Sequence, residues 1–351
     1  MTTMTTPTAP AASAARRRPV PWTKLAWVTW RQHRLALAGV VALLGVLSLY
    51  MLIMGLKMRS TLSSLGLDSC HPVTIARCST QLEIFHGAYY SRAQTLSGVL
   101  QVVPVLIGVF TGGPLLAREL ETGTFRFAWT QGCGRLRWTV AKIALIAAAV
   151  TGAAAAFSLL FSWYYQPFFA ARTDSVLAPQ LFDLRGVAFA AWTLAAFAIA
   201  TFAGAVIRRV VPAMAAALAA WTGLDLATVL FLRGHYETPV VATSVPGGNG
   251  SPLPWVLNQW WTGPDGHVAS PDQVRNVLQG GFVPRVPVRV KGHKDIQPVL
   301  QWLAQHHFTQ WFSYHPASRY WPFQAIEGGW LLALAVILGV ATVWLVRRRA
   351  A

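Results

Sequence analysis

Charged residues are scarce in this sequence, and acidic residues are the scarcest. Asp, Glu, Lys and Arg together make up 12% of the 351 residues, whereas soluble domains contain about 25%. Hydrophobic residues make up 54%, and they gather in blocks of about 20, the length of helix that crosses a bilayer. The shortage of charge therefore excludes an ordinary soluble domain and predicts an all-α polytopic membrane protein.

Motifs for catalysis and metal binding are also missing. The sequence has no Gly-x4-Gly-Lys-Ser/Thr phosphate loop, so we do not expect the chain itself to bind or hydrolyse ATP. It has no His-Glu-x-x-His or Cys-x-x-Cys pattern, and we expect no metal and no cofactor. His306, His307 and His315 lie among aromatic residues and are expected to be packed or exposed rather than ligating. No acid and base pair up at one membrane depth, so an enzyme is not expected.

The N-terminal region lacks a signal peptide of the usual form, because no apolar segment directly follows its arginines. Residues 1–20 form a basic tail rich in Thr, Ala and Pro that is expected to be disordered. Residues 21–34 carry tryptophans on one side and basic residues on the other, which favours an amphipathic helix at the membrane interface. The alternative is a positive flank of the first span, and both place the N-terminus inside.

Hydrophobic blocks predict six spans, with polar segments between them. The spans are expected at residues 35–56, 96–115, 140–163, 184–207, 212–232 and 328–346. The second contains Gly112, Gly113 and Pro114, which are expected to kink or loosen it. Residues 57–95 form a polar segment. Residues 233–327 are expected to form a large extracellular domain, and 328–351 the sixth span with a basic tail.

The distribution of basic residues predicts the orientation. With the N-terminus inside, the cytoplasmic segments 16–34, 118–142, 208–209 and 347–349 contain 16 Lys and Arg residues, against six in the short outside loops and their flanks. Positive residues concentrate on the cytoplasmic side of membrane proteins, so both termini are expected to be cytoplasmic. This pattern also accounts for the net charge of +17 without a nucleic-acid partner.

Three cysteines fit this orientation. Cys70 and Cys78 fall outside, where a disulfide can form, and their short separation would close a small loop. The alternative is two free thiols. Cys133 falls inside and is expected to stay reduced.

Asp225 is the one acidic residue expected in the interior of a span. A carboxylate there costs about 3 kcal/mol on insertion scales, and such residues usually face a bundle interior or a wet pathway. Two interpretations stay open. Asp225 makes a polar contact on a translocation route or a subunit interface, or it is protonated and hydrogen-bonded to a neighbouring helix.

The connector between the second and third spans, residues 117–138, carries the sharpest functional pattern. It reads Arg-Glu-Leu-Glu-Thr-Gly-Thr from Arg118, then Ala-Trp-Thr-Gln, then Arg-Leu-Arg-Trp. It resembles the membrane subunit of an ABC transporter of the type-2 exporter class, and is similar to permeases abundant in actinobacteria. Residues 314–327 also resemble the segment that leads into the last span of those permeases. The polar segment 233–327 is long for this class.

The resemblance implies that the connector docks a separate cytoplasmic ABC ATP-binding subunit. The residues implied in docking are Arg118, Glu119, Glu121, Gly123, Thr124 and Arg126. Gly123 can end the helical turn that precedes it, and Thr124 can cap a second short helix. The alternative is an ordinary solvated basic loop.

Two functions follow from these observations. In the first, the chain is the permease subunit of an ATP-driven exporter in the cell membrane. It pairs as a homodimer or with a related permease, and carries a hydrophobic or amphipathic substrate by analogy with the class. In the second, it is a membrane sensor or assembly protein whose extracellular domain binds a ligand.

Overall fold

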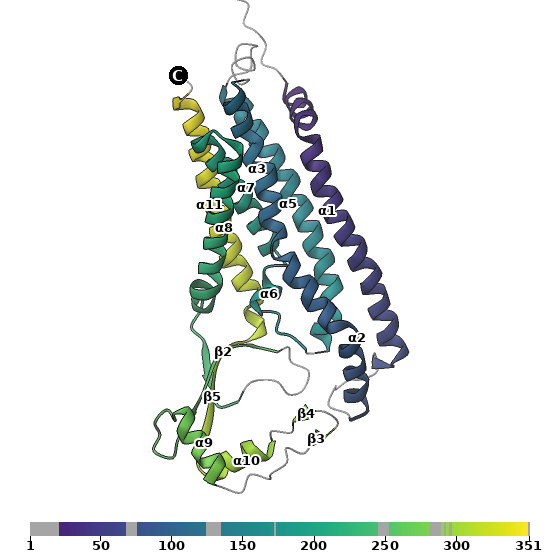
Figure 1. Ribbon diagram of the computed structural model, residues 1–351, viewed down its shortest axis with the longest axis vertical. Coiled ribbons are helices and arrows are strands. Elements are labelled where there is room, and N and C mark those ends of the chain that lie inside the picture. The colour runs from purple at the N-terminus through teal and green to yellow at the C-terminus, as the bar shows by residue number, and fades with distance from the viewer. Residues whose placement is uncertain are drawn as a thin grey trace, which may run out of the picture.

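The fold is a bundle of long helices with a small β-sheet at one end (Figure 1). The computed structural model describes residues 21–67, 76–123, 135–171, 173–244, 253–280, 289–290, 293–294 and 297–349. The helices of the bundle are α1 (Trp22–Ser64), α2 (Ala76–Leu100), α3 (Val103–Thr122), α5 (Arg135–Ala170), α6 (Pro179–Phe182), α7 (Ala188–Ile207), α8 (Val210–Ala227) and α11 (Tyr320–Arg349). A π-helical turn, Thr228–Leu232, and a 3-10 turn, Arg233–His235, continue α8.

Within these described residues, six helical stretches are long and apolar enough to cross a membrane. They contain five of the six expected spans, with α2 and α3 together forming the second, and the fourth, expected at 184–207, begins at Ala188. On α1, α8 and α11 many large apolar side chains are exposed, including Leu35, Val211 and Val340. In a bilayer this surface faces lipid, which is as apolar as the side chains themselves.

The polar segment 57–95 is helical over most of its described length, which corrects the expectation of a loop between the first two spans. Helix α1 runs on to Ser64, and α2 begins at Ala76. Its 43 residues give α1 a length of about 65 Å, roughly twice the hydrocarbon core of a bilayer. Residues 22–34 are the beginning of this helix and not a separate one; their position at the membrane interface stays a prediction.

The glycines of α3 allow close packing against α7 and do not break the helix. Helix α3 is continuous through Gly112, Gly113 and Pro114, so the expected kink or loosening is not seen as a helix break. A Cβ atom on Gly108 would lie 2.3 Å from the Cβ of Ala196, and one on Gly112 would lie 2.5 Å from a backbone oxygen of α7. Small residues let helix backbones approach closely in lipid, and α3 and α7 form the buried centre of the bundle.

A three-stranded antiparallel sheet lies in the segment between α8 and α11, so the all-α class holds for the bundle but not for the whole chain. The strands are β1 (Val240–Ala242), β2 (Trp255–Thr262) and β5 (Thr309–His315), in the order β1-β5-β2. Two helices, α9 (Pro271–Gly280) and α10 (Gln297–Gln305), and the short pair β3 (Arg289–Val290) and β4 (His293–Lys294) complete the segment. Alternating and aromatic residues such as those of β2 favour strands.

We call the end of the bundle that carries this sheet the sheet end, and the opposite end the connector end. Figure 1 shows the beginning of α1 and the C-terminus at the connector end, far from β2 and β5. The end of α3 and the beginning of α5, which border the connector 117–138, lie at the connector end as well. The candidate docking residues and the sheet therefore occupy opposite ends of the molecule.

Candidate docking site at the connector end

The last turn of α3 carries the candidate docking residues. Arg118, Glu119 and Glu121 lie on this turn, which ends at Thr122. Gly123 follows with φ 70°, the left-handed conformation that glycine adopts without a Cβ penalty. Thr124 and Arg126 lie outside the described residues. The turn continues the spanning helix, so its position is set by the buried centre of the bundle.

Glu119 joins the end of α3 to α5. The Glu119 carboxylate forms an ion pair with the Nζ atom of Lys142, whose side chain is 1% exposed. The same ammonium lies 5.1 Å from the centre of the Trp138 ring, close enough for a cation–π interaction. Removing one partner of a buried ion pair costs about 3–5 kcal/mol, so this pair holds the two helices together.

Glu121 joins the end of α3 to the beginning of α8. Its Oε2 atom accepts a hydrogen bond from the backbone N–H of Val210 at 3.1 Å. Val210 is the first residue of α8, and the side chain of the N-cap residue Arg209 makes no hydrogen bond to the free N–H groups of this first turn. A carboxylate is favoured at a helix N-terminus, where unpaired N–H groups give a partial positive charge. Both connector acids are therefore used inside the chain.

Arg118 takes part in neither of these two links. Its side chain is exposed, and it makes no ion pair within the described part of the chain. It lines a cavity of about 540 Å³ together with His33 of α1 and the Glu119–Lys142 pair. The Nε2 atom of His33 is buried without a hydrogen-bond partner among the described residues.

The beginning of α1 packs beside the beginning of α5. Leu25 and Trp138 belong to one small apolar cluster, and the Arg137 guanidinium lies 4.7 Å from the centre of the Trp22 ring. The start of α1, the end of α3 and the start of α5 thus form one surface at the connector end. Its exposed charges include Arg31, Arg34 and Arg118.

A buried ionic cluster at the sheet end was not foreseen from the sequence. Arg233 is fully buried and donates from Nε to Glu327 Oε2 at 3.0 Å and from Nη2 to Glu327 Oε1 at 2.7 Å. It also forms an ion pair with Asp183, donating from Nη1 at 3.2 Å. These three residues, which we call the outer ionic cluster, join the loop before α7, the end of α8 and α11.

Neutral donors complete the outer ionic cluster. Tyr236 O–H donates to Glu327 Oε2 at 3.0 Å, and the indole N–H of Trp192 donates to Glu327 Oε1 at 2.9 Å. Burial raises the pKa of the Asp183 carboxyl to about 7, against the opposing effect of Arg233. Asp183 and Glu327 share the one positive charge of Arg233, so a proton bound to Asp183 removes the second, unbalanced negative charge. The cluster fixes the sheet segment to the bundle, because β1 follows the 3-10 turn Arg233–His235 in the chain and β5 comes shortly before α11.

Asp225 is half-buried on α8, and its side chain makes no hydrogen bond or ion pair with any other described residue. It lies near the outer ionic cluster, because its charge interacts with those of Asp183, Arg233 and Glu327. Neither of the two interpretations of Asp225 is tested by this arrangement.

Other predicted residues are placed as follows. Cys78 is buried and disulfide-bonded, and Cys70 and Cys133 lie outside the described residues, so the Cys70–Cys78 pairing stays a prediction.

His315 uses both ring nitrogens, with Nε2 3.1 Å from the Gly234 carbonyl oxygen and Nδ1 2.7 Å from Arg319. Among the described residues no group of three His, Cys, Asp or Glu side chains could hold a metal.

Six membrane-length helices with an apolar surface define a multi-pass membrane protein. Residues 41–233 match the family described as ABC-2 membrane transporter related, and the chain belongs to that family. It is therefore a multi-pass protein of the plasma membrane and of the permease type found in ABC transporters. The match ends at Arg233 and does not include the sheet segment or α11. No curated protein and no solved structure matches the chain.

Proposed function

We propose that this chain is the permease subunit of an ABC exporter driven by a separate cytoplasmic ATP-binding subunit. That subunit docks on the connector 117–138 and on the adjoining start of α1. Two copies, or one copy with a related permease, form the transport path. The substrate is hydrophobic or amphipathic, an assignment that follows from the class of transporter.

The observation that supports this proposal is the double link at the end of α3. Glu119 pairs with Lys142 on α5, and Glu121 accepts from Val210 on α8. A force on the connector would therefore act on three helices together and not on one turn alone. A transport subunit needs such a link, because the motor lies outside the membrane and the path lies within it.

Arg118 offers the partner a contact that these links do not use. It is exposed on the same turn as the two acids, with Arg31 and Arg34 of α1 exposed at the same end. Charged groups at a solvated rim set the orientation and rate of association with a partner of opposite charge. We therefore expect the docking face of the ATP-binding subunit to carry acidic residues opposite Arg118.

The test is co-purification of an ATP-binding subunit with the tagged chain in mild detergent. We expect Arg118→Glu to reduce the amount of bound subunit at least fivefold, because it places like charges in contact. Arg118 is a better probe than Glu119 or Glu121, since reversing either acid would also break a link inside the bundle.

Arg275→Glu is the matched control. Arg275 is exposed on α9 in the sheet segment and pairs with its neighbour Asp272 in a surface salt bridge, which contributes little to stability. This variant should bind the ATP-binding subunit as the wild type does. Loss of the subunit from both variants, or from neither, would count against docking at the connector. A chain that binds no ATPase at all would favour the sensor or assembly interpretation.

A further inference from the structure

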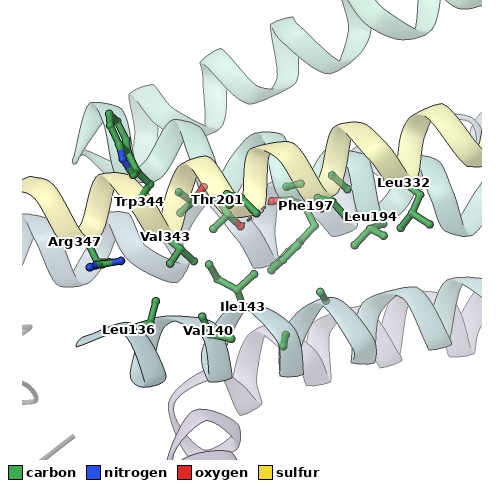
Figure 2. A pocket seen from close by; sticks show the side chains of 18 residues that line it. Leu136, Val140, Ile143, Leu194, Phe197, Thr201, Leu332, Val343, Trp344 and Arg347 are labelled. Atoms are coloured by element: carbon green, nitrogen blue, oxygen red, sulfur yellow. Dashed lines mark hydrogen bonds between the residues drawn. The ribbon is translucent and has the colours of Figure 1, made fainter. Parts of the chain in front are cut away.

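A lateral groove runs between α5 and α11, with α7 as its floor (Figure 2). Its volume is about 530 Å³, within the range of about 300–1,000 Å³ typical of ligand sites. Val140 and Ala144 border it on α5, and Gly339 and Val340 on α11. Almost all of its wall is apolar, and Val340 is 65% exposed, so the groove opens to the surrounding lipid.

The length of the groove matches an acyl chain. Its α11 wall extends from Leu332 to Arg347, a length of about 22 Å at the helical rise. The hydrocarbon core of a bilayer is about 30 Å thick, so each leaflet contributes about 15 Å of acyl chain. An acyl chain of one leaflet can therefore lie along the groove between α5 and α11.

One end of the groove is positively charged. Arg347 lines it there, and Figure 2 places its guanidinium beside Val343, at the connector end of α11. Arg347 is exposed and has no ion pair among the described residues. Its neighbour Arg348 does not line the groove and instead packs over the Trp344 ring, 4.4 Å from the ring centre. Basic side chains at the mouth of an apolar site between spanning helices recognise anionic lipid headgroups, and interfacial tryptophan anchors that level in the bilayer.

We propose that this groove binds one acyl chain of an anionic phospholipid, with the headgroup held by Arg347. The chain of the lipid fills the apolar space between α5 and α11, and the phosphate lies at the level of Trp344. This site requires only that the protein lies in a bilayer, so it is independent of the proposed ATP-driven transport. Of the residues that line the groove, only Leu136 belongs to the connector 117–138.

Native mass spectrometry of the detergent-purified chain tests the proposal by titration with phosphatidylglycerol, phosphatidylcholine of the same acyl chains, and palmitate. We expect one phosphatidylglycerol to bind at least fivefold more tightly than phosphatidylcholine, the preference that one basic residue gives. Arg347→Gln should remove this preference. Arg348→Gln should keep it, because Arg348 does not line the groove.

A second pair of variants tests the groove itself. Gly339 lines the groove, and a Cβ there would meet no atom within 4 Å, so Gly339→Phe can place its ring in the groove and should abolish binding of the phospholipid. Ile337→Phe adds a ring on the lipid face of the same helix, where Ile337 is 63% exposed, and should bind as the wild type does. Equal binding by Gly339→Phe and the wild type would overturn the proposal.

A photoreactive benzoylphenylalanine in place of Val340 identifies the occupant directly in membranes. We expect an adduct whose added mass is that of an anionic phospholipid. An adduct with a second copy of the chain would show instead that the groove is a subunit interface. Palmitate that binds as tightly as phosphatidylglycerol would overturn the assignment of a phospholipid headgroup.

Discussion

At the sheet end, the outer ionic cluster buries two carboxyl groups against a single guanidinium group. Arg233 is fully buried between Asp183 and Glu327, and its guanidinium hydrogen-bonds to both carboxylates. One positive charge thus faces two negative charges away from water. Burying an uncompensated charge is costly, so the cheapest response is for one carboxyl to keep its proton. Asp183 has the raised pKa, about 7, because burial outweighs its attraction to Arg233.

This arrangement predicts that stability falls as the pH rises. The folded Asp183 holds a proton up to about pH 7, whereas an unfolded Asp loses it near pH 4. Between about pH 4 and pH 7 the folded state therefore binds one more proton than the unfolded state. The free energy of unfolding that this proton contributes is fully present at low pH and is lost as the pH rises through about 7. From pH 5 to pH 8 we expect a loss on the order of 2 kcal/mol from this group. Thermal unfolding in detergent, followed by tryptophan fluorescence, measures it.

Asp183→Asn isolates the contribution of this residue. The amide keeps the shape of the carboxyl and carries no charge, so the variant should show a smaller fall in unfolding temperature between pH 5 and pH 8 than the wild type. Titrating groups far from Asp183 are the same in both proteins and cancel in the comparison, whereas Glu327 and Asp225 interact with Asp183 and contribute to the difference. Parallel pH profiles for the two proteins would refute the assignment of the proton to Asp183.

Whole helices were easier to predict than their ends and contacts. Hydropathy located all six spans, because an apolar run of membrane length has one stable arrangement in lipid. It missed the helical extensions within 57–95, where polar residues continue α1 and begin α2 outside the apolar blocks. It also missed the sheet, since the strands β1 and β5 pair residues about 70 positions apart.

In the candidate docking site, too, the local turn was predictable from the sequence and its long-range contacts were not. Glu119, Glu121 and Gly123 stand out locally as a helical turn that ends in a glycine, and Gly123 does end α3. The partners of the acids do not stand out, because Lys142 is 23 residues from Glu119 and Val210 is 89 residues from Glu121. Arg233 and Glu327 were predicted only as the first and last residues of the extracellular domain, and their pairing across 94 residues was not foreseen. Such pairs are decided by the packing of the bundle.

Packing between α3 and α7 gives a prediction at the scale of elements. A Cβ at Gly108 would lie 2.3 Å from Ala196 Cβ and 2.5 Å from the Phe197 nitrogen, whereas carbon atoms pack at about 3.5–4.0 Å. Backbone atoms cannot move aside, so Gly108→Ala must push α3 away from α7. We expect a destabilisation of about 1–3 kcal/mol, as for other overpacked cores, measured as a lower unfolding temperature in detergent.

Gly152→Ala is the control for the Gly108 variant. A Cβ on Gly152 of α5 would meet nothing within 4 Å, and alanine in a helix is more favourable than glycine by about 0.5–1 kcal/mol. This variant should unfold at the same temperature as the wild type or higher. If the two alanine variants behave alike, glycine at 108 is not required for the approach of the helices.

The whole molecule has one end for each side of the membrane. Basic residues gather at the connector end, where Arg118, Arg208 and Arg347 lie on three different elements. The sheet end carries a disulfide-bonded Cys78, and disulfides persist in oxidising compartments. Both observations favour an orientation with the connector end in the cytoplasm and the sheet end outside. The proposed docking of a cytoplasmic ATPase requires this orientation, because Arg118, Glu119 and Glu121 lie at the connector end.

Cysteine labelling in intact cells tests the orientation. A single cysteine at Asp265, in an exposed turn after β2, should react with a membrane-impermeant maleimide, and one at the exposed Arg208 should react only after the cells are permeabilised. Cys70, Cys78 and Cys133 are replaced by serine in both variants to remove background labelling. The reverse pattern would place Glu119 and Glu121 on the side without ATP, and no cytoplasmic motor could then reach the end of α3. The lipid site at Arg347 would survive that result, since each leaflet supplies acyl chains to a groove that opens sideways.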